Sequence, residues 1–244
     1  CTISAFVAEA LAFDSEYFFH KIQSNEFYQP LNAQQLEQIL LELIGDDRSE
    51  QNLFKALRIF RRRIQAHIVW RDLLRLANTM DTTRMLSDMA DVCITQGLNV
   101  VHEILAEKHG QPIGKLSKKE QRLLVLGMGK LGAGELNLSS DIDLIFCYDE
   151  DGDTQGGRRS LSHEEFFTRL GRKLIQALDN VTADGFVFRV DMRLRPYGDS
   201  GALVHNFCAL ESYYQEQGRD WERYAMIKAR AVTGEASVQA ELMN

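Results

Sequence analysis

The sequence has little cysteine, no long apolar run and no excess of basic residues. Its 4 cysteines are widely spaced and include no Cys-x-x-Cys pair, which excludes the common zinc signatures and a recognisable disulfide framework. An intracellular, reduced protein is therefore expected. No apolar stretch approaches the length of a membrane span, and no charged start followed by an apolar core indicates a signal peptide. The formal net charge of -7 argues against a general nucleic-acid or membrane-surface binder, although a local basic patch could exist. We expect a cytoplasmic protein with no nucleic-acid partner and no membrane partner.

The length of 244 residues is sufficient for one large domain or two small ones with ample core. Because the sequence begins at Cys1 and stops within a helical pattern, Glu235 to Asn244, we expect a fragment of a longer protein. The predicted fold class is α+β, a small mixed sheet flanked by mainly helical regions. We expect a helical region at residues 1–117, the core with the sheet at 118–206, and a truncated helical region at 207–244.

One stretch, residues 123–146, joins an apolar run, a glycine-rich turn and two aspartates without interruption. The run Leu123 to Leu126 predicts a strand buried on both faces. The turn allows backbone angles closed to other residues and lets a polyanion approach the main-chain N–H groups. The alternation that follows predicts a strand with Asp141 and Asp143 on one face. The glycines and serines of this turn are Gly127, Gly129, Gly132, Gly134, Ser139 and Ser140.

The two aspartates predict a cation site. Two carboxylates side by side repel each other, and a divalent cation that bridges them relieves the repulsion. Hard oxygen ligands of this kind suit Mg²⁺, which also keeps water and substrate phosphate oxygens in its shell. A parallel dinucleotide-binding fold is disfavoured, because the turn after Leu126 leads within about a dozen residues to the next strand and leaves little room for a crossover helix.

The first helical region carries clear start and stop signals. Asn32 as N-cap and Gly45 as C-terminal stop bound one predicted helix. The apolar stripe from Leu53 to Ile68 marks a longer one. Asp81 is expected to cap a third, which ends at Gly110.

An acidic, glycine-containing segment at residues 149–159 follows the aspartate strand. It lacks the spacing of an EF-hand, so we expect a mobile connector rather than a calcium site. The next helix is predicted to begin at Ser162, with Glu165 completing a capping box. This succession of strand, loop and helix indicates an α/β layer.

Arginines are concentrated in the first helical region, which is unusual for an acidic chain. The commoner interpretation is a solvated helix face with acidic neighbours. The alternative places part of this helix beside a phosphate site, where at most two or three guanidiniums could share one target. The arginines are Arg58, Arg61, Arg62, Arg63, Arg71 and Arg75.

Residues Phe186 to Arg195 alternate strictly between apolar and polar side chains, which predicts a half-buried strand. Its polar face carries one carboxylate among guanidiniums, a suitable lining for a cation together with phosphate oxygens. An ordinary strand with cross-strand ion pairs would explain this segment alone about as well. The upstream aspartate pair favours the site, because a two-metal phosphoryl site requires a third carboxylate. The charged residues are Arg189, Asp191, Arg193 and Arg195.

These segments resemble a known superfamily. A glycine-containing turn, then Ser-Ser-Asp-x-Asp, then a later strand with another Asp is similar to the nucleotidyltransferases that include DNA polymerase β and the aminoglycoside-modifying enzymes. Residues 127–146, 189–196 and 221–230 together more closely resemble the glutamine synthetase adenylyltransferase family, as does Leu-Arg-Ile-Phe-Arg-Arg-Arg at 57–63. Members carry two homologous nucleotidyltransferase domains, and residues 213–224 look like the N-terminal copy, which removes AMP from a tyrosine of glutamine synthetase.

The resemblance implies a reaction and a set of site residues. The reaction is magnesium-dependent phosphorolysis, in which inorganic phosphate attacks the adenylyl phosphorus, ADP departs and the tyrosine hydroxyl is restored. Asp141 and Asp143 match the metal-binding pair and Asp191 the third acid of a two-ion magnesium site. Ala133 departs from a common glycine and is expected to be tolerated if its backbone angles are ordinary. The predicted phosphate and nucleotide contacts are Gly129, Lys130, Gly132, Ser139, Ser140, Arg193 and Arg195.

The implied partners are glutamine synthetase, the PII signal protein, inorganic phosphate and an adenine nucleotide. Three alternatives stay open. An AMP-adding domain would share the aspartates and consume ATP instead of phosphate. A small-molecule nucleotidyltransferase fits the long helical lead-in and the tyrosine-rich tail poorly. A non-catalytic regulatory module has no need of three carboxylates.

Overall fold

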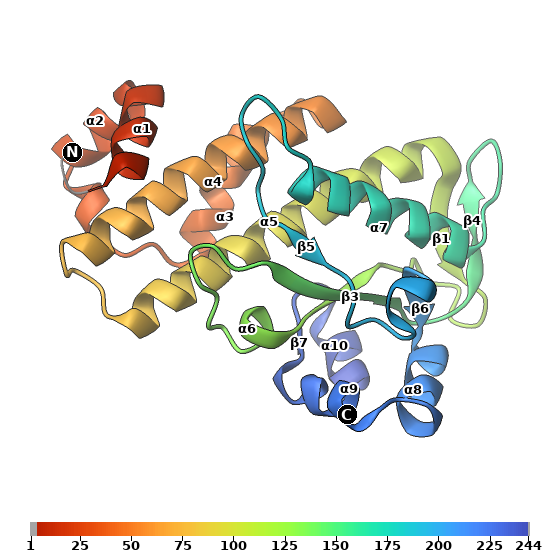
Figure 1. Cartoon of the computed structure of the whole chain (residues 1–244). Helices are drawn as coiled ribbons and strands as arrows, with labels where there is room; N and C mark the ends of the chain where they lie inside the picture. Colours follow the sequence, from red (N-terminus) through yellow and green to blue (C-terminus); the bar gives the residue numbers. More distant parts are fainter. Residues whose placement is uncertain (1–3, 244) are drawn as a thin grey trace.

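The structure is a computed structural model that describes residues 4–243, and it combines a helical layer with two small sheets (Figure 1). This mixed composition confirms the predicted α+β class. The elements before the first strand are α1 (Ala5–Phe13), α2 (Ser15–Gln23), the 3₁₀ turn η1 (Glu26–Tyr28), α3 (Ala33–Ile44), α4 (Glu50–Leu73) and α5 (Thr79–His109).

The helical layer forms because each long helix buries an apolar stripe against its neighbours. Helices α3, α4 and α5 pack on one another, and α7 (His163–Asp179) packs on α5 and α4. Their shared core also receives one face of the larger sheet. The long helices therefore cover one face of the larger sheet (Figure 1).

Local capping explains where these helices begin and end. Asn32 and Gln35 form a reciprocal capping box at α3, and Gly45 ends the helix with a φ of +57°, so both predicted bounds are confirmed. At α5 the N-cap is Asn78, and the prediction of Asp81 is wrong by three positions. Asn78 has the extended backbone that an N-cap requires, whereas Asp81 already lies in the first helical turn and completes the capping box.

Helix α7 begins at the predicted place. Ser162 accepts a hydrogen bond from the backbone N–H of Glu165 at 3.2 Å, which confirms the N-cap. The second half of the predicted capping box is wrong. The Glu165 carboxylate pairs with Arg169, one turn further along, at 2.5 Å. A guanidinium is a stronger partner for a carboxylate than a neutral N–H group is.

The larger sheet is mixed and has the strand order β5-β3-β2-β7, with β6 also paired to β3. β2 and β3 are antiparallel, β7 is antiparallel to β2, and β5 and β6 run parallel to β3. Strand β7 lies outside the region at 118–206 in which the sequence predicts the sheet. The strands are β2 (Leu124–Gly127), β3 (Ile142–Tyr148), β5 (Val190–Asp191), β6 (Val204–Asn206) and β7 (Arg230–Ala231).

Both faces of β2 are buried, as its uninterrupted apolar sequence predicts. Leu123 and Val125 contribute to the main core, whereas Leu124 and Leu126 contribute to a second cluster on the opposite face. That second cluster is closed by elements from the end of the chain. They are α8 (Phe207–Glu216), α9 (Asp220–Ala225), the 3₁₀ turn η3 (Met226–Lys228) and α10 (Ala236–Met243).

The sequence prediction of a mobile connector at 149–159 is wrong. Strand β4 (Gly152–Gly156) pairs antiparallel with β1 (Gly110–Gly114) to form the second sheet. A Cβ atom at Gly110 would lie 2.2 Å from the carbonyl oxygen of Gln155, so the strands approach this closely only because Gly110 has no side chain. The partner of β4 lies some forty positions upstream, which no local pattern reveals.

The predicted long strand from Phe186 to Arg195 is also wrong, since only β5 is formed there. Val187 and Phe188 are both buried, and both backbone N–H groups donate to the carbonyl of Leu178, so the alternation of faces fails. After Asp191 the chain turns at once, with the N–H of Arg195 donating to Met192 at 3.2 Å. A further 3₁₀ turn, η2 (Gly198–Ser200), precedes β6.

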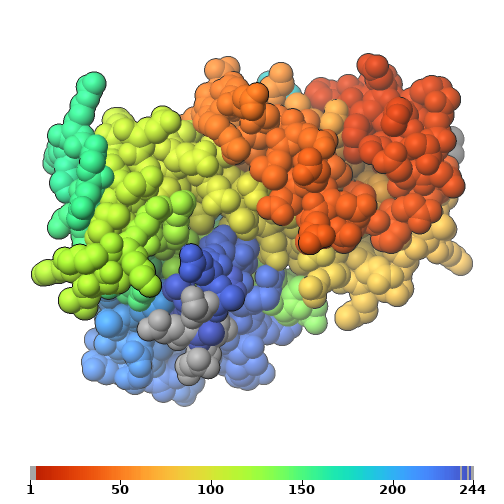
Figure 2. Space-filling view, turned by 180° about the vertical axis from the view of Figure 1, so that it is seen from behind, coloured from red at the N-terminus to blue at the C-terminus, as the bar shows by residue number. Residues whose placement is uncertain are grey.

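The molecule is elongated, and its N-terminal helices gather at one end (Figure 2). The described part of the last predicted helix is α10, and Asn244 lies outside the described residues. Among the described residues, none of the helices has the length and apolar character needed to span a membrane.

Candidate active site

The parallel pairing of β3 with β5 brings two of the predicted acids together. Asp143 and Asp191 are register partners across the two strands. Asp141 lies two residues before Asp143, at the entry to β3. Side chains two residues apart on an extended chain share a face. The structure thus brings Asp191 to the Asp141 and Asp143 pair, some fifty positions upstream, at the β5 edge of the sheet. Figure 1 shows β5 beside β3.

Asp143 is the electrostatic centre of this group. Burial raises the pKa of its carboxyl, and the negative charges of Asp191 and Asp141 raise it further, while Arg193 and Lys130 act in the opposite direction. Among residues 4–243 the Asp143 carboxylate has no hydrogen-bond or ion-pair partner. A half-buried carboxylate that faces like charges without a direct partner is a feature of functional sites.

The other two acids are each held by an arginine. The guanidinium of Arg193 donates from Nε to both carboxylate oxygens of Asp191, at 3.1 and 2.9 Å, and this hydrogen bonding lowers the pKa of Asp191. Asp141 pairs with Arg189 at 2.6 Å. Both guanidiniums are mostly exposed to solvent, so they can exchange their partners at little cost.

The glycine-rich turn forms the backbone wall beside Asp143. It folds into the short helix α6 (Gly129–Gly132), directly after β2. Gly129 has a φ of +53°, and a Cβ atom there would lie 3.0 Å from Oδ2 of Asp143. Only glycine allows the backbone to approach the carboxylate this closely. Ala133 has ordinary helical angles, which confirms that an alanine is tolerated there.

The predicted serines lie in the loop between α6 and β3. Ser139 is exposed, and its carbonyl accepts a hydrogen bond from Arg189 at 3.4 Å. Ser140 donates its N–H to the carbonyl of Asn137 at 3.2 Å. The loop is held from below by two helices: Gln65 of α4 donates to the carbonyl of Leu138, and Ser87 of α5 accepts from the N–H of Leu136.

The basic residues of the prediction divide into two kinds. Lys130 and Arg193 are exposed, and their positive charges lower the pKa of Asp143. Arg195 is mostly buried, and its Nη1 donates to the carbonyl of Met192 at 2.7 Å. The Nε of Arg195 is buried without a hydrogen-bond partner among the described residues. Arg195 supports the turn after β5 in this structure, although its charge still lowers the pKa of Asp191.

The chemistry of the acids fits a hard cation. All the donors are carboxylate oxygens, and Asp143 faces the negative charges of Asp191 and Asp141 with no direct partner among the described residues. As the side chains stand in residues 4–243, no group of three His, Cys, Asp or Glu side chains is arranged to hold a metal ion. A cation would compete with Arg189 for Asp141 and with Arg193 for Asp191.

The arginines of α4 do not line this site. Arg58 is 2% exposed and donates to the carbonyls of Ala177, Asn180 and Gly185, around the C-terminal end of α7. The other described contacts join α4 to α1, α2 and neighbouring turns. They place Arg61 over Phe186, Arg62 over Phe13, Arg63 on Asp14, and Arg71 on the carbonyls of Tyr28 and Leu76. Neither a solvated face nor a phosphate cluster describes Arg58, which has a structural role.

Two residues behind the glycine-rich turn are not among the predicted site residues. Arg230 pairs with Asp91 of α5 at 2.9 Å and also donates to the carbonyls of Leu131 and Gly132. The sequence signal for Arg230 was its position in the segment 221–230. Asp91 carries no local signal, because its partner is 139 positions away.

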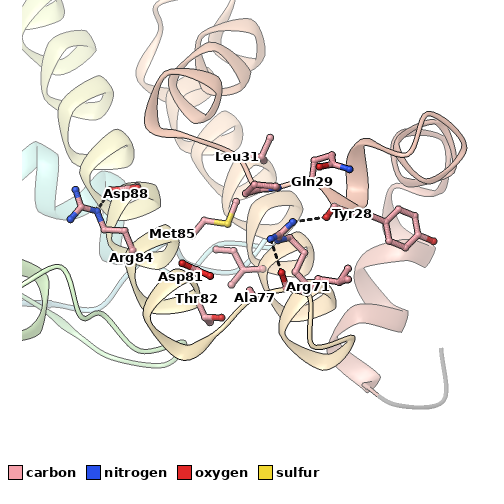
Figure 3. A pocket seen from close by; sticks show the side chains of 13 residues that line it. Tyr28, Gln29, Leu31, Arg71, Ala77, Asp81, Thr82, Arg84, Met85 and Asp88 are labelled. Atoms are coloured by element: carbon pink, nitrogen blue, oxygen red, sulfur yellow. Dashed lines mark hydrogen bonds and ion pairs between the residues drawn. The ribbon is translucent and has the colours of Figure 1, made fainter.

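The helical layer also contains a hollow of about 550 Å³ between α4, α5 and the segment before α3 (Figure 3). Arg71 lies in its wall and donates to the carbonyl of Tyr28, as Figure 3 shows, and also to the carbonyl of Leu76 at 3.1 Å. The guanidinium of Arg71 is therefore occupied by hydrogen bonds to backbone carbonyls of the protein. The three aspartates are not among the residues that line the hollow, so it is separate from the candidate active site.

Comparison with known proteins shows which sequences this chain resembles. The family model described as glutamate-ammonia ligase adenylyltransferase matches residues 1–244. A bifunctional glutamine synthetase adenylyltransferase/adenylyl-removing enzyme of Pseudomonas aeruginosa is 54% identical over 98% of this chain, which covers 24% of that protein. The protein of the same name from Hahella chejuensis is 51% identical over 99% of the chain, covering 25% of its length. The chain therefore spans about a quarter of the length of these relatives.

Proposed function

The chain belongs to the glutamate-ammonia ligase adenylyltransferase family, and from this premise we propose that it contains the adenylyl-removing site. It would remove AMP from the modified tyrosine of glutamine synthetase by magnesium-dependent phosphorolysis. The resemblance of residues 189–198 and 213–224 to the AMP-removing copy supports this choice. We assign the larger sheet with α6 to the nucleotidyltransferase fold.

The proposed reaction exchanges one phosphorus–oxygen bond for another. An oxygen of inorganic phosphate attacks the adenylyl phosphorus, and the bond from that phosphorus to the tyrosine oxygen breaks. The products are ADP and a tyrosine that regains its hydroxyl proton. Both reactants are anions, so the residues around them must offset negative charge as they approach.

The observation that carries the proposal is the pairing of Asp143 with Asp191, next to Asp141. These three acids would hold two Mg²⁺ ions, which supply positive charge to the phosphoryl oxygens and to the leaving tyrosine oxygen. Arg193 and Lys130 stand beside the acids and would bind phosphate oxygens once a cation has taken over the carboxylates. Gly129, Ser139 and Ser140 would direct N–H and O–H donors toward the nucleotide, and Arg195 would add positive charge. The N–H of Gly132 already donates to the carbonyl of Met128 at 3.0 Å, so the predicted contact of Gly132 would be limited to shaping the turn.

The test is the release of ADP from adenylylated glutamine synthetase supplied with inorganic phosphate. Asp143→Asn should lower the rate by more than about 100-fold, because it removes a charged ligand from the centre of the site. Asp153→Asn is the control, since Asp153 is exposed on β4, which belongs to the other sheet. A wild-type rate in the Asp143→Asn variant would exclude the proposed site.

The second candidate is the AMP-adding activity, which the names of the relatives also include. It uses the same acids, so geometry alone favours neither direction. Supplying ATP with unmodified glutamine synthetase, and phosphate with the modified form, separates the two. AMP incorporation from ATP without ADP release from the modified form would assign the AMP-adding activity to this chain in place of the AMP-removing one. We further propose a cytoplasmic protein that responds to the PII signal protein.

A further inference from the structure

Arg230 is the last residue of the segment 221–230, and the proposed site does not use it. It opens β7, where its register partner is Gly127, at the end of β2. Its guanidinium donates from Nε to the carbonyl of Gly132 at 3.3 Å and from Nη2 to the carbonyl of Leu131 at 3.1 Å. Arg230 thus binds the C-terminal end of α6 from behind.

Helix α6 needs such support because it is too short to hold its own shape. It has 4 residues, and two of them are glycines, which lose the most conformational freedom on folding. The last carbonyls of any helix lack partners within the helix. The guanidinium of Arg230 gives the carbonyl of Gly132 a donor and adds a second donor to the carbonyl of Leu131, which also accepts from the N–H of Gly134 at 3.1 Å. A charged donor makes such bonds about twice as strong as a neutral one does.

The backbone before Arg230 is also fitted to the turn. A Cβ atom at Gly132 would lie 1.8 Å from the carbonyl oxygen of Lys228, so the two main chains are in direct contact. The ammonium group of Lys228 pairs with Glu135 at 3.1 Å, just after α6. Residues 228–230 therefore contact the turn in three ways: through the main chain of Lys228, through its ammonium group and through the guanidinium of Arg230.

Asp91 of α5 orients the guanidinium. Its carboxylate accepts from Nη2 of Arg230 at 3.0 Å and lies 2.9 Å from Nη1. Burial raises the pKa of the Asp91 carboxyl, and the hydrogen bond and charge of Arg230 oppose this shift most strongly, with a smaller effect from Arg84. Each group thus compensates the charge of the other, and the pair joins the helical layer to the glycine-rich turn.

We propose that Arg230, oriented by Asp91, is a positioning residue that holds the glycine-rich turn against Asp143. The other end of α6 is Gly129, whose backbone lies beside the Asp143 carboxylate. A displacement of the turn would therefore change the wall of the site without removing any group that touches substrate. This inference rests on the proposed function for its kinetic consequence, but not for its structural one.

The structural test is amide hydrogen exchange in the intact protein. Arg230→Gln and Asp91→Asn should each speed exchange in residues 129–134 by about tenfold, with β3 unchanged, because the turn alone loses its anchor. Arg63→Gln is the matched control: the ion pair of Arg63 with Asp14, at 2.6 Å, is similarly enclosed but joins α4 to the segment between α1 and α2. Unchanged exchange at the turn, or an equal rise everywhere, would overturn the proposal.

The kinetic test uses the same variants with adenylylated glutamine synthetase. Arg230→Gln should lower kcat/KM for inorganic phosphate about tenfold, and Arg230→Lys should recover part of this loss, because an ammonium restores the charge beside Asp91 without spanning both carbonyls. Arg63→Gln should lose stability but keep the wild-type kcat/KM. Equal losses in Arg230→Gln and Arg63→Gln would show a general structural effect and refute positioning. If the wild type releases no ADP, the proposed function fails, while the exchange experiment still decides the role of Arg230.

Discussion

Asp143 is bounded by backbone on one side and by negative charge on the other. Gly129 approaches its carboxylate with bare main chain, and Asp191 stands opposite it on β5. Because of this enclosure there is little room for a side chain at Gly129, and the pKa of Asp143 is raised. At the residue scale, two predictions separate the contribution of the backbone from that of the charge.

The first prediction concerns Gly129→Ala. The new methyl group would stand 3.0 Å from Oδ2 of Asp143, in a left-handed conformation. We expect a loss of about 1 kcal/mol in the free energy of unfolding and a rate of ADP release at least about tenfold lower. Gly185→Ala is the control, since Gly185 has a φ of +92° and no atom within 4 Å of its missing Cβ. It should lose stability and keep activity; equal activity in both variants would contradict the steric role of Gly129.

The second prediction concerns Arg193→Ala. Hydrogen bonds from Arg193 are the main reason that the pKa of Asp191 is lowered, so removing them should raise this pKa. A carboxyl titration followed by ¹³C NMR in the metal-free protein measures the change. Arg189→Ala should leave the pKa of Asp191 unchanged, because Arg189 pairs with Asp141 and not with Asp191. A carboxyl of Asp191 that titrates identically in wild type and Arg193→Ala would exclude this cause.

At the scale of single elements, helix ends decide much of the fold. Arg58 binds carbonyls at the end of α7 and in the turn after it, and its side chain is almost fully buried. The helix and the turn before β5 are thereby fixed to α4. Since β5 carries Asp191, this arginine supports the site from a distance.

Arg58→Ala should therefore destabilise the protein by about 3 kcal/mol, because it removes a charged donor from the carbonyls of Ala177, Asn180 and Gly185 and leaves a cavity where an almost fully buried side chain stood. Denaturant unfolding measures the loss. Arg62→Ala is the neighbouring control, since Arg62 makes one such bond, to the carbonyl of Asp184 at 3.1 Å, and should cost about 1 kcal/mol. Equal losses in the two variants would mean that the carbonyl contacts of Arg58 are not what stabilises α7.

Sequence predicts those elements whose signals are local. The caps Asn32 and Ser162 were predictable because each bonds a residue three positions away. The strand β4 was not, since its partner β1 is remote and its own sequence is acidic and rich in glycine. The predicted strand at 186–195 failed because Val187 and Phe188 are both drawn into the core. Alternation along a short segment cannot reveal that a helix end binds both of their N–H groups.

The candidate site shows the same division. Asp141 and Asp143 were predictable from their spacing after the glycine-rich turn, and Asp191 from its polar setting together with the family resemblance. The partnership of Arg230 with Asp91 was not, because two residues 139 positions apart leave no periodic trace in one sequence. What a sequence conceals is therefore mainly the support behind the site.

At the scale of the whole molecule, two buried histidines link stability to pH. His67 of α4 and His102 of α5 lie in different parts of the helical layer, 5% and 2% exposed. Burial lowers the pKa of each to about 4. The unfolded chain binds these protons near the ordinary pKa of 6.5, and the folded chain does so only near 4, so acid favours unfolding across this interval.

We predict that stability is independent of these groups above about pH 7 and falls as the pH drops from 6.5 to 4, by up to about 3 kcal/mol for each histidine. Thermal unfolding at several pH values measures the slope. His67→Gln and His102→Gln should each flatten it, whereas His20→Gln, at an exposed position, should not. An unchanged slope in the double variant would assign acid unfolding to other groups.

The edge of β2 has a consequence for synthesis on the ribosome. β7 and the residues after it cover that edge: the N–H of Val232 donates to Val125, whose own N–H donates to the hydroxyl of Thr233. At about 5–20 residues per second, β2 is made several seconds before these residues emerge. During this interval a nascent chain carries an apolar strand with one open side, a template for pairing with other chains. Chaperone binding to stalled chains should therefore peak before residue 230 and decline once Thr233 is free to fold.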